Sequence, residues 1–366
     1  MHRGITSKEE ANHFLSPTAE DLNDPYLLSS MDNCVIRLSA ALNDGERMGV
    51  FGDFDTDGLT GTAVLTKGLE NLGGIVFPYV PHRVKEGHGI SQKAIDFFEQ
   101  RKVTLIITVD CGTTSISEIT QASQKGIDTI VTDHHVPMDS LPPAVAIVNP
   151  SLSDSKYPFP QITGVGTALK VMEALYSSLS QEMPNFLYAF CALGTVSDVG
   201  LMKDENRYLT QRGIQAIKSE NILGIDALIR VSGITKNRLS SEDLSFGIIP
   251  RLNVAGRLQH AELSLDLLLT ENDSQALSLA EKLNALNKTR QTLTDKAIRQ
   301  ARQQVAKSVR ENGNNMPPMI FVGHKSWSPG ILGLIAARLV EEFYSCLLYT
   351  SPSPRDRSTS RMPSSA

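Results

Sequence analysis

The strongest constraint on the fold is a regular alternation of apolar and amphipathic segments between residues 49 and 149. Short apolar runs of the kind found in buried strands occupy residues 49–52, 75–80, 104–109, 128–132 and 145–149. Helix-like segments separate the first four runs, at residues 59–72, 91–100 and 115–124. Strands that alternate with helices indicate βαβ units, whose strands run parallel. The sequence therefore predicts an α/β fold with a doubly wound, mostly parallel sheet.

Acidic side chains gather where the first of these strands ends. Asp53, Asp55 and Asp57 occupy alternate positions in the turn that follows it. Carboxylates this close repel one another unless a cation neutralises them, and open α/β sheets bind ligands at the carboxyl ends of their strands. The turn therefore predicts a divalent metal site. An acidic surface turn closed by Asp57-Gly58 is the simpler alternative.

An apolar run followed by an aspartate occurs three more times. The three further places are Asp110, the triplet Asp133-His134-His135, and Asp198. One aspartate in such a position is more often a helix cap than a metal ligand, but four repeats favour a shared site. Carboxylate together with neutral imidazole suits Mn²⁺ or a similar first-row ion better than Ca²⁺.

These motifs, in this order, resemble the four motifs of the DHH phosphoesterase superfamily. Two further segments are similar to elements of its RecJ family: residues 83–89, Arg-Val-Lys-Glu-Gly-His-Gly, and residues 250–258, Pro-Arg-Leu-Asn-Val-Ala-Gly-Arg-Leu. His82 and His88 depart from the family pattern, which has Asn and Tyr there. Residues 327–333 resemble the start of the DHH-associated domain. The resemblance covers about residues 30–345 and implies an exonuclease specific for single strands.

The resemblance also implies how the chain is divided. Residues 1–30 would be an irregular extension, 31–258 the DHH domain with a helical part, 259–312 a connector with a long helix at 272–311, and 313–345 the truncated start of a second α/β domain. The long helix carries seven basic residues, from Lys288 to Arg310. Such a run is usually a solvated face, with phosphate contact as the alternative.

The stretch 346–366 is expected to be a non-native tail. Its two ends are similar to a translated sequencing adapter, and its Ser/Pro/Arg-rich composition also fits an ordinary disordered tail. It is therefore left out of the fold prediction, as a processing or cloning remnant would be.

Two divalent cations, Mn²⁺ or Mg²⁺, are the cofactors that the resemblance implies. One ion would be held by Asp55 and Asp110, and the other by Asp57, Asp110, His134 and Asp198. Asp53 and Asp133 are further candidate ligands. His135 would contact the phosphate that is cut, so His135 and Asp110 are the candidate catalytic residues.

The two RecJ-like segments supply candidate substrate contacts, because a guanidinium group matches the geometry of phosphate. The candidate substrate-binding residues are Arg83, His88, Arg251, Asn253 and Arg257. For the arginines the alternative is an ordinary ion pair. For His88, stacking on a base and a solvated loop position are both consistent with the sequence.

The expected activity is metal-dependent 5′→3′ digestion of single-stranded DNA in repair and recombination. A DHH phosphodiesterase that acts on short oligonucleotides or cyclic dinucleotides is the alternative, although such enzymes lack the Arg-x-x-Glu-Gly-x-Gly element. A pyrophosphatase of the superfamily would have His-x-x-Pro-Asp-x-Asp, which residues 51–57 do not match. Expected partners are a single-strand-binding protein and a helicase, with the enzyme itself a monomer.

The composition is consistent with a cytoplasmic nucleic-acid enzyme. The formal net charge of −5 does not exclude such an enzyme, because basic contacts need only be local. No apolar run reaches the ~20 residues of a membrane span, and the first residues lack the apolar core of a signal peptide. Cys34, Cys111 and Cys191 lack paired or metal-type spacing, which suits a reducing compartment. The prediction is a cytoplasmic location without membrane contact.

Overall fold

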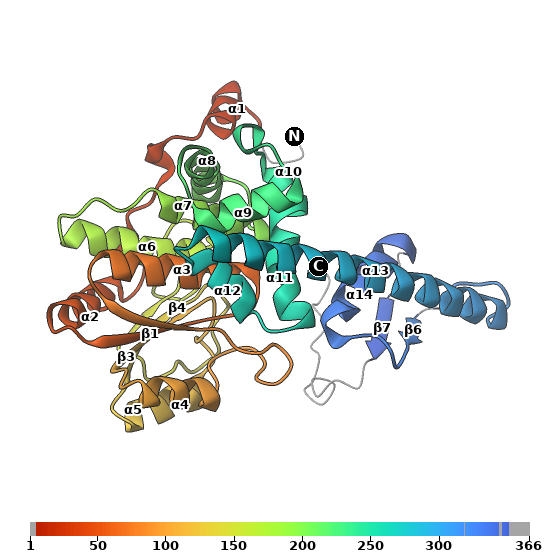
Figure 1. Ribbon diagram of the computed structural model, residues 1–366, viewed down its shortest axis with the longest axis horizontal. Coiled ribbons are helices and arrows are strands. Elements are labelled where there is room, and N and C mark those ends of the chain that lie inside the picture. Colours follow the sequence, from red (N-terminus) through yellow and green to blue (C-terminus); the bar gives the residue numbers. More distant parts are fainter. Residues whose placement is uncertain (1–4, 318, 344–345, 351–366) are drawn as a thin grey trace.

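The computed structural model describes residues 5–317, 319–343 and 346–350, and its centre is a five-stranded parallel sheet (Figure 1). The strands are β1 (Arg47–Gly52), β2 (Ile75–Tyr79), β3 (Leu105–Val109), β4 (Asp128–Thr132) and β5 (Ala146–Val148). Their order in the sheet is β2-β1-β3-β4-β5. The winding direction reverses between β1 and β3, which confirms the predicted doubly wound fold. Ligands of such sheets bind at this reversal, outside the carboxyl ends of the two strands.

Helices cover both faces of the sheet (Figure 1). The first face carries α2 (Met31–Asn43), α3 (Thr56–Asn71) and α6 (Gly164–Ser178), and the second carries α4 (Gln92–Gln100) and α5 (Ile116–Gln124). Successive strand side chains point to opposite faces, so Val50 of β1 lies in the first core and Phe51 in the second. Both faces are buried along most of β1, β3, β4 and β5, which explains why these strands are largely apolar rather than alternating.

A helical layer follows the sheet and packs onto α3 and α6. It consists of α7 (Phe186–Ser197), α8 (Asp204–Ser219), α9 (Leu223–Ser232), the short α10 (Ser241–Asp243) and π-helical η4 (Leu244–Ile248), α11 (Ile249–Leu258) and α12 (Glu262–Leu269). Helix α7 is apolar on nearly all sides and is therefore buried along most of its length. Its position brings Asp198, the residue that follows the last residue of α7, toward the sheet.

The long helix α13 (Asp273–Glu311) crosses from this layer to a second, smaller unit (Figure 1). That unit contains β6 (Met319–Gly323), α14 (Pro329–Phe343) and β7 (Cys346–Thr350), with β6 and β7 parallel. Trp327 and Ile331 pack against Ala297 and Ala301 of α13 in a third core. The predicted long helix is confirmed. Although α13 is long, it is largely polar, and in the described part of the chain no helix is both long and apolar enough to cross a membrane.

The N-terminal segment differs from the prediction. The expectation of an irregular extension at residues 1–30 is wrong, because Ser7 and Glu10 form a capping box that starts α1 (Lys8–Leu15); two 3₁₀ turns, Ala19–Asp21 and Pro25–Leu27, follow it. The first five residues of the predicted non-native tail form β7 and pair with β6; that the stretch is non-native stays a prediction. The remainder of that predicted tail, 351–366, lies outside the described residues.

Candidate metal centre

The carboxyl ends of three neighbouring strands bring the predicted ligands together. Asp53 and Asp55 follow β1, Asp110 follows β3, and Asp133-His134-His135 follows β4, while Asp198 arrives at the C-terminus of α7. Among the described residues, three groups have ligand atoms within 4.8 Å of one another. They are Asp53, Asp55 and Asp110 (the carboxylate group); Asp57, His134 and Asp198 (the mixed group); and Asp110, His134 and His135.

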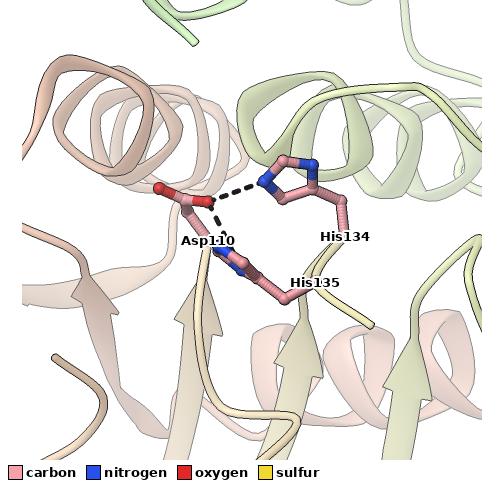
Figure 2. Close-up of side chains that lie close together, drawn as sticks. All are labelled: Asp110, His134 and His135. Atoms are coloured by element: carbon pink, nitrogen blue, oxygen red, sulfur yellow. Dashed lines mark hydrogen bonds and ion pairs between the residues drawn. The ribbon is translucent and has the colours of Figure 1, made fainter. Parts of the chain in front are cut away.

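Asp110 and His134 connect the carboxylate group to the mixed group. His134 Nε2 lies 3.1 Å from Asp110 Oδ1 and 3.9 Å from Asp57 Oδ2. Figure 2 shows Asp110 facing both imidazoles, with His135 Nδ1 3.9 Å from Asp110 Oδ1. The structure therefore places two candidate cation sites side by side, with Asp110 between them.

Asp57 is held by the N-terminus of α6. Its carboxylate oxygens accept hydrogen bonds from the backbone N–H of Gly164 at 2.8 Å and of Val165 at 2.9 Å. Free N–H groups and the helix dipole both favour negative charge at this end of a helix. Gly164 leaves no room for a larger residue, since a Cβ there would lie 2.7 Å from Asp110 Cβ. Residues 163–166, Thr-Gly-Val-Gly, belong to none of the four motifs. They are the sequence signal that could have indicated this helix N-terminus.

Asp55 and Asp110 both sit in constrained turns. Asp55 caps α3, because its Oδ1 accepts hydrogen bonds from the N–H of Asp57 at 2.9 Å and of Gly58 at 3.2 Å; the helix-cap and ligand interpretations are thus compatible. Asp110 has φ of +59°, a left-handed conformation that side chains other than Asn and Asp rarely adopt. Strain of this kind is typical of functional sites, where it aims a side chain.

Burial and mutual repulsion raise the pKa of the crowded carboxyl groups. Burial, then the charges of Asp57 and Asp55, raise the pKa of Asp110 well above its usual value. Burial, then Asp198 and Asp55, do the same for the pKa of Asp57. Asp53 Oδ1 is buried without a hydrogen-bond partner. Buried carboxylates with too few donors are the ligand set of a hard divalent cation, so these residues fit such an ion.

Asp133 orients the two histidines and belongs to none of the three groups. Its Oδ1 accepts hydrogen bonds from the His134 N–H at 2.8 Å and the His135 N–H at 3.2 Å, and lies 2.8 Å from His135 Nδ1. This contact with Asp133 raises the pKa of His135 to about 9. Burial lowers the pKa of His134, which favours the neutral form that binds metals. His135 is exposed and favours the charged form.

Three predicted substrate contacts lie beside the acidic turn. The Arg83 guanidinium lies 4.9 Å above the centroid of the Phe54 ring. His88 Nδ1 is 3.0 Å from Asp53 Oδ2. The residue before Arg257, Gly256, packs closely on the backbone of Phe54: a Cβ added at Gly256 would lie 2.8 Å from the Phe54 carbonyl oxygen. The RecJ-like segments thus border the candidate metal centre from the loop after β2 and from α11.

Arg251 and Asn253 instead have partners within the protein. Asn253 Oδ1 accepts a hydrogen bond from the Thr56 N–H at 2.9 Å, and its Nδ2 donates to Ser197 Oγ at 3.3 Å. Asn253 therefore ties the turn of Asp55 and Asp57 to the residue before Asp198. Arg251 donates to Asn284 Oδ1 at 3.0 Å and to the Gly247 carbonyl.

Without metal, neutralising one crowded carboxylate should stabilise the protein. A carboxyl group whose pKa is raised on folding destabilises the folded state above that pKa, and the penalty is relieved as pH falls toward the unfolded-state pKa. Asp110→Asn should therefore raise Tm in excess chelator at neutral pH, and this gain should shrink as the pH falls through the raised pKa of Asp110 toward the ordinary pKa of an aspartate. Thermal melts test this against Asp139→Asn, an exposed carboxylate. A Tm below that control would contradict the electrostatic account.

Comparison with known proteins gives a consistent result. The chain matches the DHH family, N-terminal domain, over residues 47–195. It is 35% identical over 348 residues to the single-stranded-DNA-specific exonuclease RecJ of Bacillus subtilis (strain 168), covering 94% of this chain and 43% of that protein. The RecJ exonuclease of Escherichia coli (strain K12) is 34% identical over 363 residues, covering 96% of this chain and 62% of that protein. The chain thus spans about half the length of the relatives it matches.

Solved structures agree with the sequence matches. A crystal structure of exonuclease RecJ bound to manganese superposes with a TM-score of 0.79 at 33% identity, covering 91% of this chain and 82% of that one. RecJ of Thermus thermophilus in complex with Mn²⁺ gives a TM-score of 0.80 at 31% identity, covering 95% of this chain and 49% of that one. With the fold, the motif order and the ligand geometry in agreement, the chain belongs to the RecJ family of DHH phosphoesterases.

Proposed function

We propose that this protein hydrolyses phosphodiester bonds of single-stranded DNA from the 5′ end, with two divalent cations as cofactors. The arrangement of two ligand groups carries this proposal. The carboxylate group and the mixed group lie next to each other at the switch point between β1 and β3, where Asp110 of the first group contacts His134 of the second. Support comes from relatives named single-stranded-DNA-specific exonucleases and from RecJ structures solved with Mn²⁺ and Mg²⁺. In a cell, the role would be DNA repair and recombination in the cytoplasm, as a monomer that works with a single-strand-binding protein and a helicase.

The two groups would each hold one cation. The carboxylate group takes one ion and the mixed group the other, with Asp110 close enough to serve both. Such a pair of ions activates water and neutralises the charge that develops at phosphorus. Asp133 stays outside both groups; it contacts the imidazole of His135 and accepts a hydrogen bond from the backbone N–H of His134. Asn253 has a positioning role here, because it links the Asp55 turn to the helix that ends at Asp198.

His135 would bind the phosphate that is cut. Asp133 holds its Nδ1, which leaves the other ring nitrogen for substrate, and a pKa of about 9 keeps the ring positively charged at neutral pH. Arg83, His88 and Arg257 lie beside the acidic turn after β1 and would contact the strand there. The reacting bond would lie over the metal centre, within reach of the cationic imidazole of His135.

Labelled single strands test the activity and its polarity. With Mn²⁺ or Mg²⁺, a 5′-labelled strand should release its label at once as a mononucleotide, whereas a 3′-labelled strand should give a ladder of shortening products. Both reactions should stop in excess chelator and resume when the ion is restored, because the ligand set cannot activate water without a cation. Blunt duplex should be spared.

Other outcomes would replace the proposal with a specific alternative. Cleavage confined to dinucleotides or cyclic dinucleotides would favour the short-substrate phosphodiesterase. The reverse label pattern would indicate digestion from the 3′ end. Full activity in excess chelator would exclude the two-metal centre.

A further inference from the structure

Val199, the residue after Asp198, combines an unfavourable backbone conformation with an exposed side chain. Its φ is +57°, and a β-branched residue in this left-handed region is an outlier. The side chain is 87% exposed, so packing inside the protein does not compensate for the strain. Strain of this kind, next to a candidate metal ligand, indicates a function for the side chain.

The turn at Val199 is a Schellman motif, in which a helix ends with one left-handed residue. The N–H of Gly200 donates to the Thr195 carbonyl at 3.1 Å, and the N–H of Val199 donates to the Val196 carbonyl at 3.4 Å. Glycine is the usual residue at the left-handed position. Helices α2, α3 and α5 of this chain end in the same way, with the positive-φ glycines Gly45, Gly73 and Gly126. The turn after α7 could therefore form with glycine, and does not itself require valine.

Val199 also lines a hollow of about 370 Å³ beside the metal centre. One wall consists of Val196, Val199 and Gly200, which flank Asp198 in the sequence. The other walls come from the start of the α7–α8 connection, from α8, and from the α10–η4 segment that includes Ser241 (Figure 1). The C-terminal turn of α7 thus separates the hollow from the mixed group.

The lining suits a flat group with apolar faces and polar edges. Apolar side chains are mixed with hydroxyl and amide groups, as in Met202, Ile214, Thr210 and Gln211. Among the described lining residues only Arg207 is charged, and its guanidinium carbon lies 3.8 Å from the centroid of the Phe14 ring. A nucleobase has such faces and edges, and the volume is within the range of small-molecule sites.

We propose that this hollow binds a nucleobase of the single strand, close to the bond that is cut, with Val199 packed against the base. This inference rests on the proposed function. Asp198 and His135 are the exposed members of the three ligand groups, so the metal centre is open to a strand on the side where Val199 lies. The contact would not depend on base identity, because every base has an apolar face.

Val199→Gly tests whether the side chain has a structural role. In the absence of DNA its Tm should rise by about 1–3 °C, because relief of the β-branched left-handed conformation outweighs the extra freedom of glycine in the unfolded chain. Lys102→Gly is the matched control. Lys102 has φ of +56° in the same motif after α4, at the end of the sheet away from the metal centre. A clear fall in the Tm of Val199→Gly would assign Val199 to the fold and overturn the inference.

Binding of a labelled oligothymidine, measured by fluorescence anisotropy in excess chelator, tests the hollow. Val199→Gly should lose about 3- to 10-fold in affinity, because an apolar contact with the base is removed. Lys102→Gly should bind as the unsubstituted chain does. Ser241→Trp, a bulky change at an exposed position of the lining, should lose about 10-fold or more because it fills the hollow. Ser241→Ala, which removes the hydroxyl group without filling the space, should lose little.

A single abasic residue, moved along the strand, locates the bound base, because it removes one base and keeps every phosphate. The unsubstituted chain should lose affinity when the abasic residue occupies one particular position near the 5′ end. Ser241→Trp should be indifferent to that same position. Equal responses of both proteins at every position would overturn the inference.

The activity of the unsubstituted chain separates the possible failures. If it digests single strands while Val199→Gly and Ser241→Trp bind DNA as tightly as their controls, the inference fails and the proposed function stands. If the unsubstituted chain neither binds nor digests single-stranded DNA, both fail.

Discussion

Asp110→Asn should lower kcat on single-stranded DNA by ~10³-fold or more, the scale expected when one preorganised charge in a reactive centre is lost. Asp110 belongs to two of the three ligand groups and is the residue where the carboxylate group meets His134. Asparagine preserves the shape of the side chain and tolerates the left-handed backbone at this position. A lower kcat in Asp110→Asn would therefore result from the missing negative charge and not from a disturbed turn.

Asp139→Asn is the matched control, since Asp139 is exposed in the segment that follows His135. It should retain a near-normal kcat, and calorimetric titration should give it unchanged Mn²⁺ binding. Asp110→Asn should bind Mn²⁺ more weakly, with fewer ions per chain. A near-normal kcat in Asp110→Asn and in Asp110→Ala would show that Asp110 is not a shared ligand.

Strands β1, β3, β4 and β5 were predictable because they are buried along most of their length and bounded by turn residues. The segments 104–109 and 128–132 become β3 (Leu105–Val109) and β4 (Asp128–Thr132), with differences of at most one residue at either end. Once parallel strands are established, their carboxyl ends must share one edge of the sheet. For this reason Asp110 and the triplet 133–135 could be placed together from sequence order alone.

Contacts between remote segments were not predictable from local pattern. Asn253 reaches Thr56 and Ser197, and nothing near Asn253 in the sequence indicates those partners. The same holds for Arg290, because a basic run on a long helix is usually solvated, and only the packing of α13 on α11 buries one member of it. Residues 346–350 pair with β6, and nothing in their local sequence indicates that remote partner.

Lys170→Met should lower the free energy of unfolding by about 3–5 kcal/mol, the cost of breaking a fully buried ion pair. Lys170 of α6 lies 2.6 Å from Glu205 Oε1 of α8, and both side chains have no exposed surface. Burial lowers the pKa of Lys170, but Glu173 and Glu205 raise it further, so the amine stays charged. Without that amine, Glu205 is left as a buried charge with only neutral donors.

Urea denaturation of paired variants separates lost charge from lost packing. Adding Glu205→Leu to Lys170→Met should restore much of the loss, since the stranded carboxylate is then gone. Lys125→Met, which removes a lysine near Glu99 on the surface, should change stability little because exposed pairs contribute little. The same α6 that carries Lys170 presents Gly164 and Val165 to Asp57. If loss of the ion pair lets α6 shift, Lys170→Met should also weaken Mn²⁺ binding. The double variant should then recover part of the Mn²⁺ affinity. If the double variant is no more stable than Lys170→Met, lost packing around α6, and not the stranded charge of Glu205, accounts for the destabilisation.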